Sequence, residues 1–408
     1  MYKVKVLKDT MLILAISFTL LVVSELMLRI IFPEKLMDTP KKSAYEVNKD
    51  YLISLKPNIK RTFVRSDRNG GDIIHWRTNS NSFRGAELLD NPKTRIIVYG
   101  DSNIQARFSK DENTYPVKLK TYLIKTGVTD IEVVNAGVIG FGPDQSLIKF
   151  EKEADNYKPN MVIFHIFADN DFGDVFRNRL FKLDANHSLI ETGYRNTVDD
   201  HLCAMKQRKF ISSLLIVRAA KQLARRIKPS LRNKSEIRKG KEERLNLLQQ
   251  LVEEEFSVYK GGQPGKHFHL LGHYDLDLAL DPDKESSKTK IKLMEAILKK
   301  ANIVARSKGI KFLIVIQPSV IDLTKGNAVL DYEYLEQYPK YRRTNLSDAV
   351  KNICVANNIN YINLYEVFVK NDPENLFFRD GDDHWNDQGQ DIAAKETASY
   401  IVNRKMIE

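Results

Sequence analysis

Short apolar runs alternate with segments of helical spacing along the second part of the chain. Five runs rich in β-branched residues predict strands at 95–99, 131–135, 161–167, 311–317 and 359–364. Between several of them, apolar residues recur with helical spacing at 114–127, 143–157, 287–309 and 346–358. Strands that alternate with helices form parallel sheets with right-handed crossovers, so this pattern predicts a three-layer α/β/α fold around a mainly parallel five-stranded sheet.

The most apolar segment of the chain lies near the N-terminus, at residues 10–32. About 20 such residues suffice to cross a bilayer. Lys3, Lys5 and Lys8 precede this segment and favour a cytoplasmic N-terminus, with the bulk of the chain on the periplasmic or cell-surface side. A cleaved signal peptide is the alternative. No Ala-x-Ala site follows, so the sequence favours a single transmembrane helix that is retained.

Proline and glycine breaks divide the chain into parts. Residues 1–36 are expected to form a cytoplasmic tip and the membrane anchor, residues 37–94 a linker and lead-in segment, and residues 95–408 the α/β domain. A large insertion, at about 177–290, separates the third predicted strand from the fourth. Insertions of this length often carry binding functions.

The formal net charge of +11 is concentrated in one segment. Residues 205–244 hold 14 Lys or Arg against three Glu, and residues 210–227 mix apolar and basic positions in a helical pattern. Such a helix can contact an anionic membrane surface or a polyanion, although docking of its apolar side on the protein body is the more common arrangement. Nucleic acid is not expected as a partner, because no aromatic stacking pattern accompanies the charge.

The chain has two cysteines, Cys203 and Cys354. A framework of several disulfides is therefore excluded. One disulfide between these two residues remains possible outside the cytoplasm.

The first predicted strand runs directly into Gly100-Asp101-Ser102. These residues lie at the carboxyl end of the strand, which is the edge where open α/β sheets bind ligands. Ser102 is therefore a candidate nucleophile. The alternative is a helix cap formed by Asp101 or Ser102, which these three residues alone do not exclude.

Glycines and polar side chains also follow the next two predicted strands. Three glycines in residues 135–145 allow the backbone to turn an N–H group toward a ligand. Within 167–174, Asn170 can offer a side-chain donor. The nearby carboxylates of Asp169, Asp171 and Asp174 suggest a cation site as a less favoured alternative, because no calcium-loop spacing follows.

A histidine lies among acidic residues near the C-terminus, in the segment 380–389. His384 follows Asp380, Asp382 and Asp383. A neutral imidazole can take a proton from a serine hydroxyl, while a carboxylate on its other ring nitrogen fixes the tautomer. His384 is thus a candidate general base.

These four blocks, in this order, resemble those of the SGNH hydrolases, the GDSL-type lipases and esterases. The resemblance covers residues 95–408 except the insertion, and TNSNSFRG at 78–85 also resembles membrane-anchored envelope members. It implies a flavodoxin-like arrangement of the sheet, a serine acyl-transfer site, and no cofactor or metal. By position, it implies Ser102 as nucleophile, His384 as base, and the N–H groups of Ser102 and Gly140 with the Asn170 side chain as the oxyanion hole.

The chain departs from the family pattern at two positions. Ala168 replaces the glycine of the third block, a small change that should leave Asn170 in place. The last block usually reads Asp-x-x-His, but Gly381 lies three residues before the histidine. Relatives that resemble alginate-acetylating envelope proteins use Asp-x-His, which implies Asp382 as the acid and leaves Asp380 in reserve.

Four other histidines are candidates for a functional role. His267, His269 and His273 could bind a metal together with Asp275, since alternate residues of a strand share one face. An ordinary polar edge of the insertion is the favoured interpretation. His165, inside the third predicted strand, is expected to be a packed core residue.

The expected chemistry is acyl transfer through an acyl-enzyme at Ser102. Transfer to water would make the protein an esterase, and transfer to a sugar hydroxyl would make it an O-acyltransferase. The anchor and the resemblance together favour ester groups, chiefly acetyl, on an extracytoplasmic glycan as the substrate. Lipid or small acyl esters are one alternative, and a catalytically inactive glycan-binding or partner subunit is another.

Overall fold

The computed structural model describes residues 2–31, 44–192, 234–261, 272–325, 330–379 and 382–407. Several residues singled out above lie outside these ranges: Cys203, His267, His269, Asp380 and most of the basic segment 205–244. The predictions that concern them, including the Cys203–Cys354 pair, therefore remain predictions. Cys354 itself is buried.

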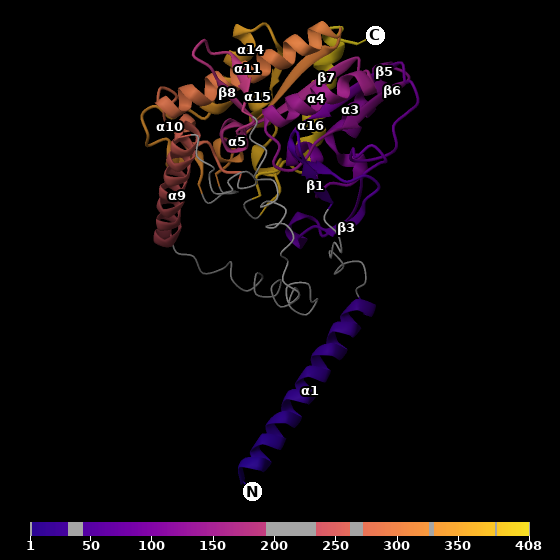
Figure 1. The fold of residues 1–408 in the computed structure, drawn as a ribbon, viewed down its shortest axis with the longest axis vertical. Helices are drawn as coiled ribbons and strands as arrows, with labels where there is room; N and C mark the ends of the chain where they lie inside the picture. The colour runs from indigo at the N-terminus through magenta and orange to yellow at the C-terminus, as the bar shows by residue number, and fades with distance from the viewer. Residues whose placement is uncertain are drawn as a thin grey trace.

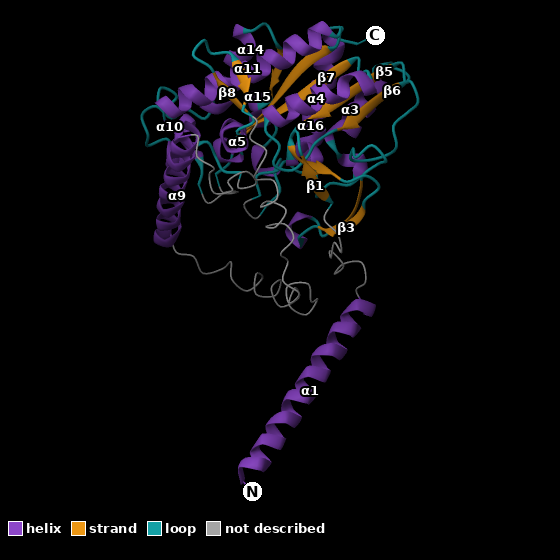
Figure 2. Cartoon of the chain, in the orientation of Figure 1, coloured by secondary structure: helices purple, strands orange, loops and turns teal. Residues whose placement is uncertain are grey.

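A five-stranded sheet forms the centre of the protein (Figure 2). Its strand order is β11-β10-β7-β5-β6, and all four neighbouring pairs are parallel. The sequence expectation of a mainly parallel five-stranded sheet is confirmed. The strands are β5 (Thr94–Tyr99), β6 (Ile131–Asn135), β7 (Met161–Ala168), β10 (Lys311–Pro318) and β11 (Asn360–Asn363).

Helices cover both faces of this sheet, which explains why its strands are apolar throughout. All eight residues of the central strand β7 are buried, as expected for a parallel strand between two helical layers. Five helices form these layers: α3 (Tyr115–Lys125), α4 (Pro143–Tyr157), α11 (Glu285–Ser307), α14 (Asn345–Ala356) and α16 (Asp387–Asn403). Given right-handed crossovers, α3 lies on one face of the sheet, and α4, α11 and α14 lie on the other. Helix α16 packs against α3 (Figure 1).

The described part of the lead-in segment, from residue 44 onward, packs on the sheet domain. It forms two antiparallel two-stranded sheets, with Phe63 and Trp76 in the hydrophobic core. The sequence predicted no strands here because each is only four or five residues long and lacks a clear alternation. They are β1 (Tyr45–Asn48), β2 (Leu52–Leu55), β3 (Lys60–Val64) and β4 (Ile73–Arg77).

The insertion after β7 begins and ends with described elements that pack on the core. Helix α9 contacts α5 and α10, and α5 also contacts α4 and α11. In Figure 1, α9 runs along one side of the body, beside α10. The described elements are α5 (Asp171–Asn178), β8 (Phe181–Leu183), β9 (Leu189–Glu191), α9 (Lys234–Gly261) and α10 (Leu276–Leu280).

Helix α1 (Tyr2–Ile31) contains the apolar N-terminal segment. Its 21-residue window Lys8–Leu28 is long and apolar enough to cross a membrane, and none of that window is buried in the protein. Figure 1 shows this helix clear of the sheet domain. It fits a single-pass membrane anchor or a signal sequence.

The remaining described elements are short and lie in the connections. One short helix and one 3-10 turn follow β5, and another 3-10 turn precedes α16. The short elements are α2 (Ser102–Gln105), α12 (Val320–Leu323), α13 (Tyr332–Leu335), α15 (Tyr365–Lys370) and the 3-10 turns Asp67–Asn69, Asp111–Asn113 and Pro373–Asn375.

Candidate active site

Ser102 is the first residue of α2, directly after β5. The helix cap is Asp101, whose side chain accepts a hydrogen bond from Asn103 N at 2.9 Å. The cap interpretation therefore holds for Asp101, while the Ser102 hydroxyl is left for another partner. Gly100 is required here by packing, because a Cβ atom at this position would lie 2.7 Å from Ile104 Cγ1.

The partner of Ser102 is His384, 282 residues further along the chain. Ser102 Oγ lies 2.7 Å from His384 Nε2. On the other side of the ring, Nδ1 lies 2.6 Å from Asp382 Oδ1. The same Asp382 oxygen accepts the backbone N–H of His384 at 3.0 Å, which fixes the carboxylate beside the ring. The three residues thus form the hydrogen-bonded series of a serine nucleophile, a base and an orienting acid.

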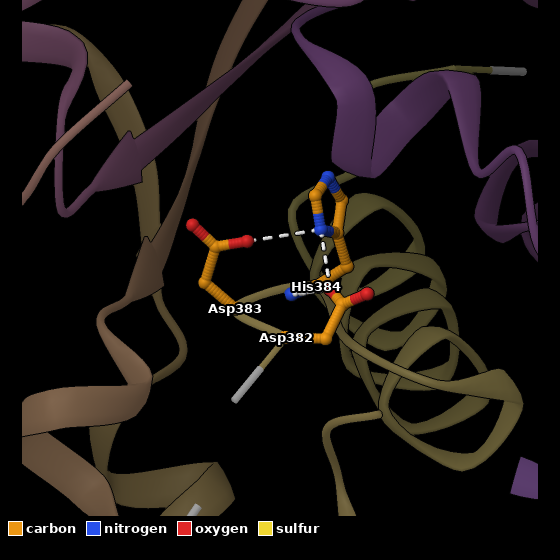
Figure 3. Close-up of side chains that lie close together, drawn as sticks. All are labelled: Asp382, Asp383 and His384. Atoms are coloured by element: carbon orange, nitrogen blue, oxygen red, sulfur yellow. Dashed lines mark hydrogen bonds and ion pairs between the residues drawn. The ribbon is translucent and has the colours of Figure 1, made fainter. Parts of the chain in front are cut away.

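A second carboxylate lies against the same ring nitrogen. Asp383 Oδ1 is 2.9 Å from His384 Nδ1, and Figure 3 shows Asp382 and Asp383 approaching it from different directions. Asp383 is the neighbour of His384 in the sequence, but no role was predicted for it. The consecutive acids before the histidine were the signal for it.

The two carboxylates control the protonation of His384. Burial lowers the pKa of this imidazole, but the contacts with Asp382 and Asp383 outweigh burial and raise the pKa well above 6.5. Asp383 responds in the opposite sense, because its contact with His384 lowers its pKa despite the cost of burial. A base must be neutral to take a proton, so activity that depends on His384 should increase as the pH rises through this raised pKa.

Asn103 connects α2, the helix that begins with Ser102, to the segment that contains His384. This buried side chain accepts hydrogen bonds from Trp385 N at 3.3 Å and from Gln317 Nε2 at 3.2 Å. In addition, Trp385 Nε1 donates to the Asn103 carbonyl at 3.1 Å. No sequence pattern indicated this role, because it depends on residues from three distant parts of the chain.

The lead-in segment also holds the serine helix. The buried guanidinium of Arg84, within the TNSNSFRG stretch, donates to the carbonyl groups of Gln105 and Ala106, and to that of Ser109 at 2.6 Å. These carbonyls belong to the end of α2 and to the residues that follow it. The backbone of Arg84 is bonded in turn to Asn135, at the end of β6.

Gly140 and Asn170 follow β6 and β7 at the same sheet edge as Ser102. Gly140 has φ of +69°, a left-handed conformation that favours glycine. The loop that contains Gly140 lies against the end of β5, because Val138 N donates a hydrogen bond to Gly100 O at 3.0 Å. Asn170 begins α5, and a Cβ atom on Gly272 would lie only 2.5 Å from its Nδ2. The roles of Gly140 and Asn170 as oxyanion donors remain predictions.

The acidic residues after β7 do not share a site. Asp169 accepts a hydrogen bond from Ser319 Oγ, Asp171 accepts one from Phe167 N at 2.7 Å, and Asp174 pairs with Arg177. Burial raises the pKa of all three, that of Asp174 to about 7. Each carboxylate has its own protein partner, so the cation-site alternative gains no support.

His273 and Asp275 belong to a buried ion cluster, and their grouping with His267 and His269 remains a prediction because those two residues lie outside the described ranges. The His273 ring lies 3.1 Å from Arg177 Nη1, and burial lowers the pKa of His273 to about 3. Asp275 accepts hydrogen bonds from Lys290 Nζ and from Gly173 N. His165 is buried, as expected, with Nε2 2.9 Å from Gln317 Oε1.

Replacing Gly137 by alanine is expected to disturb the nucleophile. A Cβ atom at Gly137 would lie 2.4 Å from Gln105 N and 2.7 Å from Ile104 C, which are backbone atoms of α2. Overpacking of this kind costs about 1–3 kcal/mol of unfolding free energy. A displaced nucleophile costs up to about 10²-fold in rate.

Urea unfolding and ester hydrolysis by the variant would measure both effects. Gly240→Ala, at a position where the added Cβ meets nothing within 4 Å, is the control. Equal behaviour of the two variants would show that Gly137 does not restrain α2.

Residues 278–408 match the family described as "SGNH hydrolase-like domain, acetyltransferase AlgX". No curated protein matches the chain. Similar solved structures include a lipase/acylhydrolase from Enterococcus faecalis (13% identity, 76% of this chain and 96% of that chain, TM-score 0.36) and the acetyl xylan esterase AlAXEase (15%, 75% and 99%, 0.35). A third is the esterase EstA from Pseudoalteromonas sp. (11%, 76% and 98%, 0.36). With such low identities and TM-scores, these three add no weight to the assignment.

The assignment rests on the family match and on how the matched part joins the rest of the chain. Residues 278–408 contain His384 and two strands of the sheet, β10 and β11. The other three strands, including β5, which ends three residues before Ser102, complete the same parallel sheet. Residues 278–408 therefore form an SGNH hydrolase-like domain together with the strands that complete its sheet.

Proposed function

We propose that Ser102, His384 and Asp382 carry out the chemistry of an ester-acting hydrolase or acyltransferase. The observation that carries the proposal is the 2.7 Å separation of Ser102 Oγ and His384 Nε2, with Asp382 2.6 Å from the other ring nitrogen. Serine hydroxyls are weak nucleophiles unless an adjacent base accepts the proton. The family match to an acetyltransferase domain supports the same class of reaction.

In the first half of the reaction, Ser102 Oγ attacks the ester carbonyl carbon while His384 Nε2 takes the hydroxyl proton. The carbonyl oxygen becomes an oxyanion, which the N–H groups of Ser102 and Gly140 and the Asn170 side chain stabilise. Loss of one such donor raises the activation barrier of a serine enzyme by about 3 kcal/mol. His384 then returns its proton to the departing alcohol oxygen, and the acyl group remains on Ser102.

In the second half, His384 takes a proton from the acceptor hydroxyl. The acceptor oxygen attacks the acyl carbon, and the proton passes back to Ser102 Oγ as the acyl-enzyme breaks. Water as acceptor releases a carboxylic acid, whereas a sugar hydroxyl yields a new ester. The same residues serve both outcomes, so the acceptor decides between esterase and transferase.

The substrate class that we propose is an O-acetylated glycan on the extracytoplasmic side of a membrane. Two observations support it: the description of the matched family as an acetyltransferase and the apolar helix α1 that precedes the enzyme domain. In this proposal α1 stays in the membrane and holds the enzyme domain near the envelope glycan. Contact of the basic segment 205–244 with an anionic membrane surface or polyanion is a further part of the proposal.

The proposal predicts a partition of acetyl groups between water and sugar. We expect the full chain in detergent to cleave p-nitrophenyl acetate and, with xylo- or manno-oligosaccharides present, to form acetylated sugars. Mass spectrometry of the oligosaccharides and titration of free acetate would measure both products. Free acetate alone would identify an esterase. Absence of turnover by the folded chain toward this ester would contradict the proposal, and turnover only of longer acyl esters would redirect it to lipid substrates.

A further inference from the structure

Two carboxylates lie beside His384 Nδ1, whereas the proposed reaction requires only one. We infer that Asp383 is a second positioning residue for His384, so that two adjacent carboxylates act on one ring nitrogen. The inference rests on the proposed function in one respect only, because it assumes that His384 is the base. Its geometric part concerns His384 itself and can be tested without turnover.

The distances at Nδ1 carry the inference. Asp382 Oδ1 lies 2.6 Å from Nδ1 and Asp383 Oδ1 lies 2.9 Å from it. A single N–H group cannot point directly at two oxygens that approach from different directions, as these do in Figure 3. One carboxylate therefore takes the directed hydrogen bond, and the other acts mainly through its charge.

The surroundings assign the directed bond to Asp382. Its Oδ1 atom also accepts the backbone N–H of His384 at 3.0 Å, so the carboxylate and the ring are held in one fixed arrangement. The backbone N–H of His384 is thus bonded to Asp382, whereas the backbone group that acts on the Asp383 carboxylate is that residue's own N–H. Asp382 thus sets the orientation and tautomer of the ring, and Asp383 adds a second negative charge beside it.

A third carboxylate, Asp169, directly follows β7 and interacts electrostatically with Asp383. It is 4% exposed and bonded to Ser319 Oγ. Burial, followed by the negative charge of Asp383, raises the pKa of Asp169 well above its usual range. This shift favours the neutral form of Asp169, and the carboxylates in contact with the His384 ring are those of Asp382 and Asp383.

A second carboxylate makes His384 a stronger base, but it also reduces the fraction of His384 that is neutral at a given pH. A protonated ring flanked by two negative charges is more stable, which favours the step in which His384 accepts the serine proton. The same stabilisation keeps the resting ring protonated to higher pH. Asp383 is therefore expected to move the working range of the enzyme to higher pH.

The test compares Asp383→Asn with wild type in two measurements on the full chain in detergent. The first is the pH dependence of kcat/KM for p-nitrophenyl acetate, where we expect the acidic limb of the variant to move down by about one pH unit, since removal of a nearby charge shifts a pKa by this amount or more. The second is an NMR titration of 15N-labelled histidine, with the His384 signal assigned by His384→Ala. We expect the pKa of His384 to fall in the variant.

The controls separate charge from fold and from general surface effects. Asp383→Glu should restore the wild-type profile in part, because it returns the charge. Asp90→Asn removes an exposed carboxylate elsewhere on the surface and should leave both measurements unchanged. Asp382→Asn should instead lower kcat by about 10³-fold or more at every pH, as loss of an orienting acid does.

The outcomes distinguish the inference from the proposed function. Superimposed titrations of His384 in wild type and Asp383→Asn would overturn the inference, even with an active enzyme. A shifted titration in a protein without turnover would uphold the role of Asp383 beside His384 and count against the proposed function. A pH profile displaced to the same extent by Asp90→Asn would also overturn the inference, because the effect would then be nonspecific.

Discussion

Replacing Ser102 by alanine is expected to lower kcat/KM for p-nitrophenyl acetate by about 10⁴-fold or more, the scale seen when a serine nucleophile is removed. The reason is the loss of the only oxygen that His384 Nε2 contacts in the described structure, at 2.7 Å. Without it, water must attack the ester directly, and only the proposed oxyanion donors still assist. Steady-state kinetics with the full chain in detergent would measure the loss.

Stability should hardly change in this variant. Ser102 is partly exposed and at the start of a four-residue helix whose cap is Asp101. Ser399→Ala, on the exposed side of α16, is the matched control and should retain full activity. Turnover by Ser102→Ala within tenfold of wild type would place the chemistry elsewhere.

Replacing Lys290 by methionine is expected to cost about 3–5 kcal/mol of unfolding free energy, because it leaves buried carboxylates without their cation. Lys290 Nζ lies 2.9 Å from Asp275, 2.8 Å from Asp277 and 3.7 Å from Glu255, and its side chain is fully buried. Urea unfolding of the variant would measure this cost.

A control on the same helix separates this effect from the loss of any lysine. Lys288 is two residues earlier in α11, has a side chain that is 59% exposed, and pairs with Asp283 at 3.7 Å. Exposed pairs of this kind contribute about 0–1 kcal/mol. Lys288→Met should therefore hardly change the free energy of unfolding. Equal losses of unfolding free energy in the two variants would contradict the claim that Lys290 stabilises the fold by neutralising buried carboxylates.

The same cluster restrains the turn that carries Asn170. Asp275 N donates to Asp169 O at 2.6 Å, and the Asp275 side chain accepts the N–H of Gly173 at 3.1 Å. Arg177, paired with Glu255 of α9, also donates to Asn170 O at 2.9 Å. The insertion is thus bonded to both sides of Asn170, so loss of Lys290 should lower activity as well as stability.

The sheet could be predicted because its strands are buried on both faces. Runs such as 161–167 are apolar without interruption, and the observed strand β7 (Met161–Ala168) differs from the prediction by one residue. The helices α4 and α14 were equally clear, since one apolar side faces the sheet. Local periodicity contains this information, and no long-range contact is needed to read it.

The lead-in strands and the buried ions were beyond the reach of the sequence pattern. β2 is only four residues long, and its burial comes from packing on a distant part of the chain. The cluster joins Arg177, Glu255 and Lys290, which are separated by tens of residues. A charged residue in a sequence is ordinarily a surface residue, so only the fold shows that these are buried partners.

At the site, sequence order and family resemblance named Ser102, His384 and Asp382, and the structure brings these three side chains together. Asp383 was given no role, because the family pattern directs attention to one acid, whereas the structure places two at the same nitrogen. Asn103 was missed for a different reason. Its contacts with Gln317 and Trp385 depend entirely on tertiary packing.

The most direct test of an activated Ser102 is covalent labelling of the full chain in detergent with a fluorophosphonate probe, followed by peptide mass spectrometry. The proposed site predicts one adduct, on Ser102, in the wild type and its loss in His384→Ala, whose fold would be checked by circular dichroism. An adduct on another residue, no adduct on the folded wild type, or equal labelling of the two proteins would contradict the proposal that His384 activates Ser102.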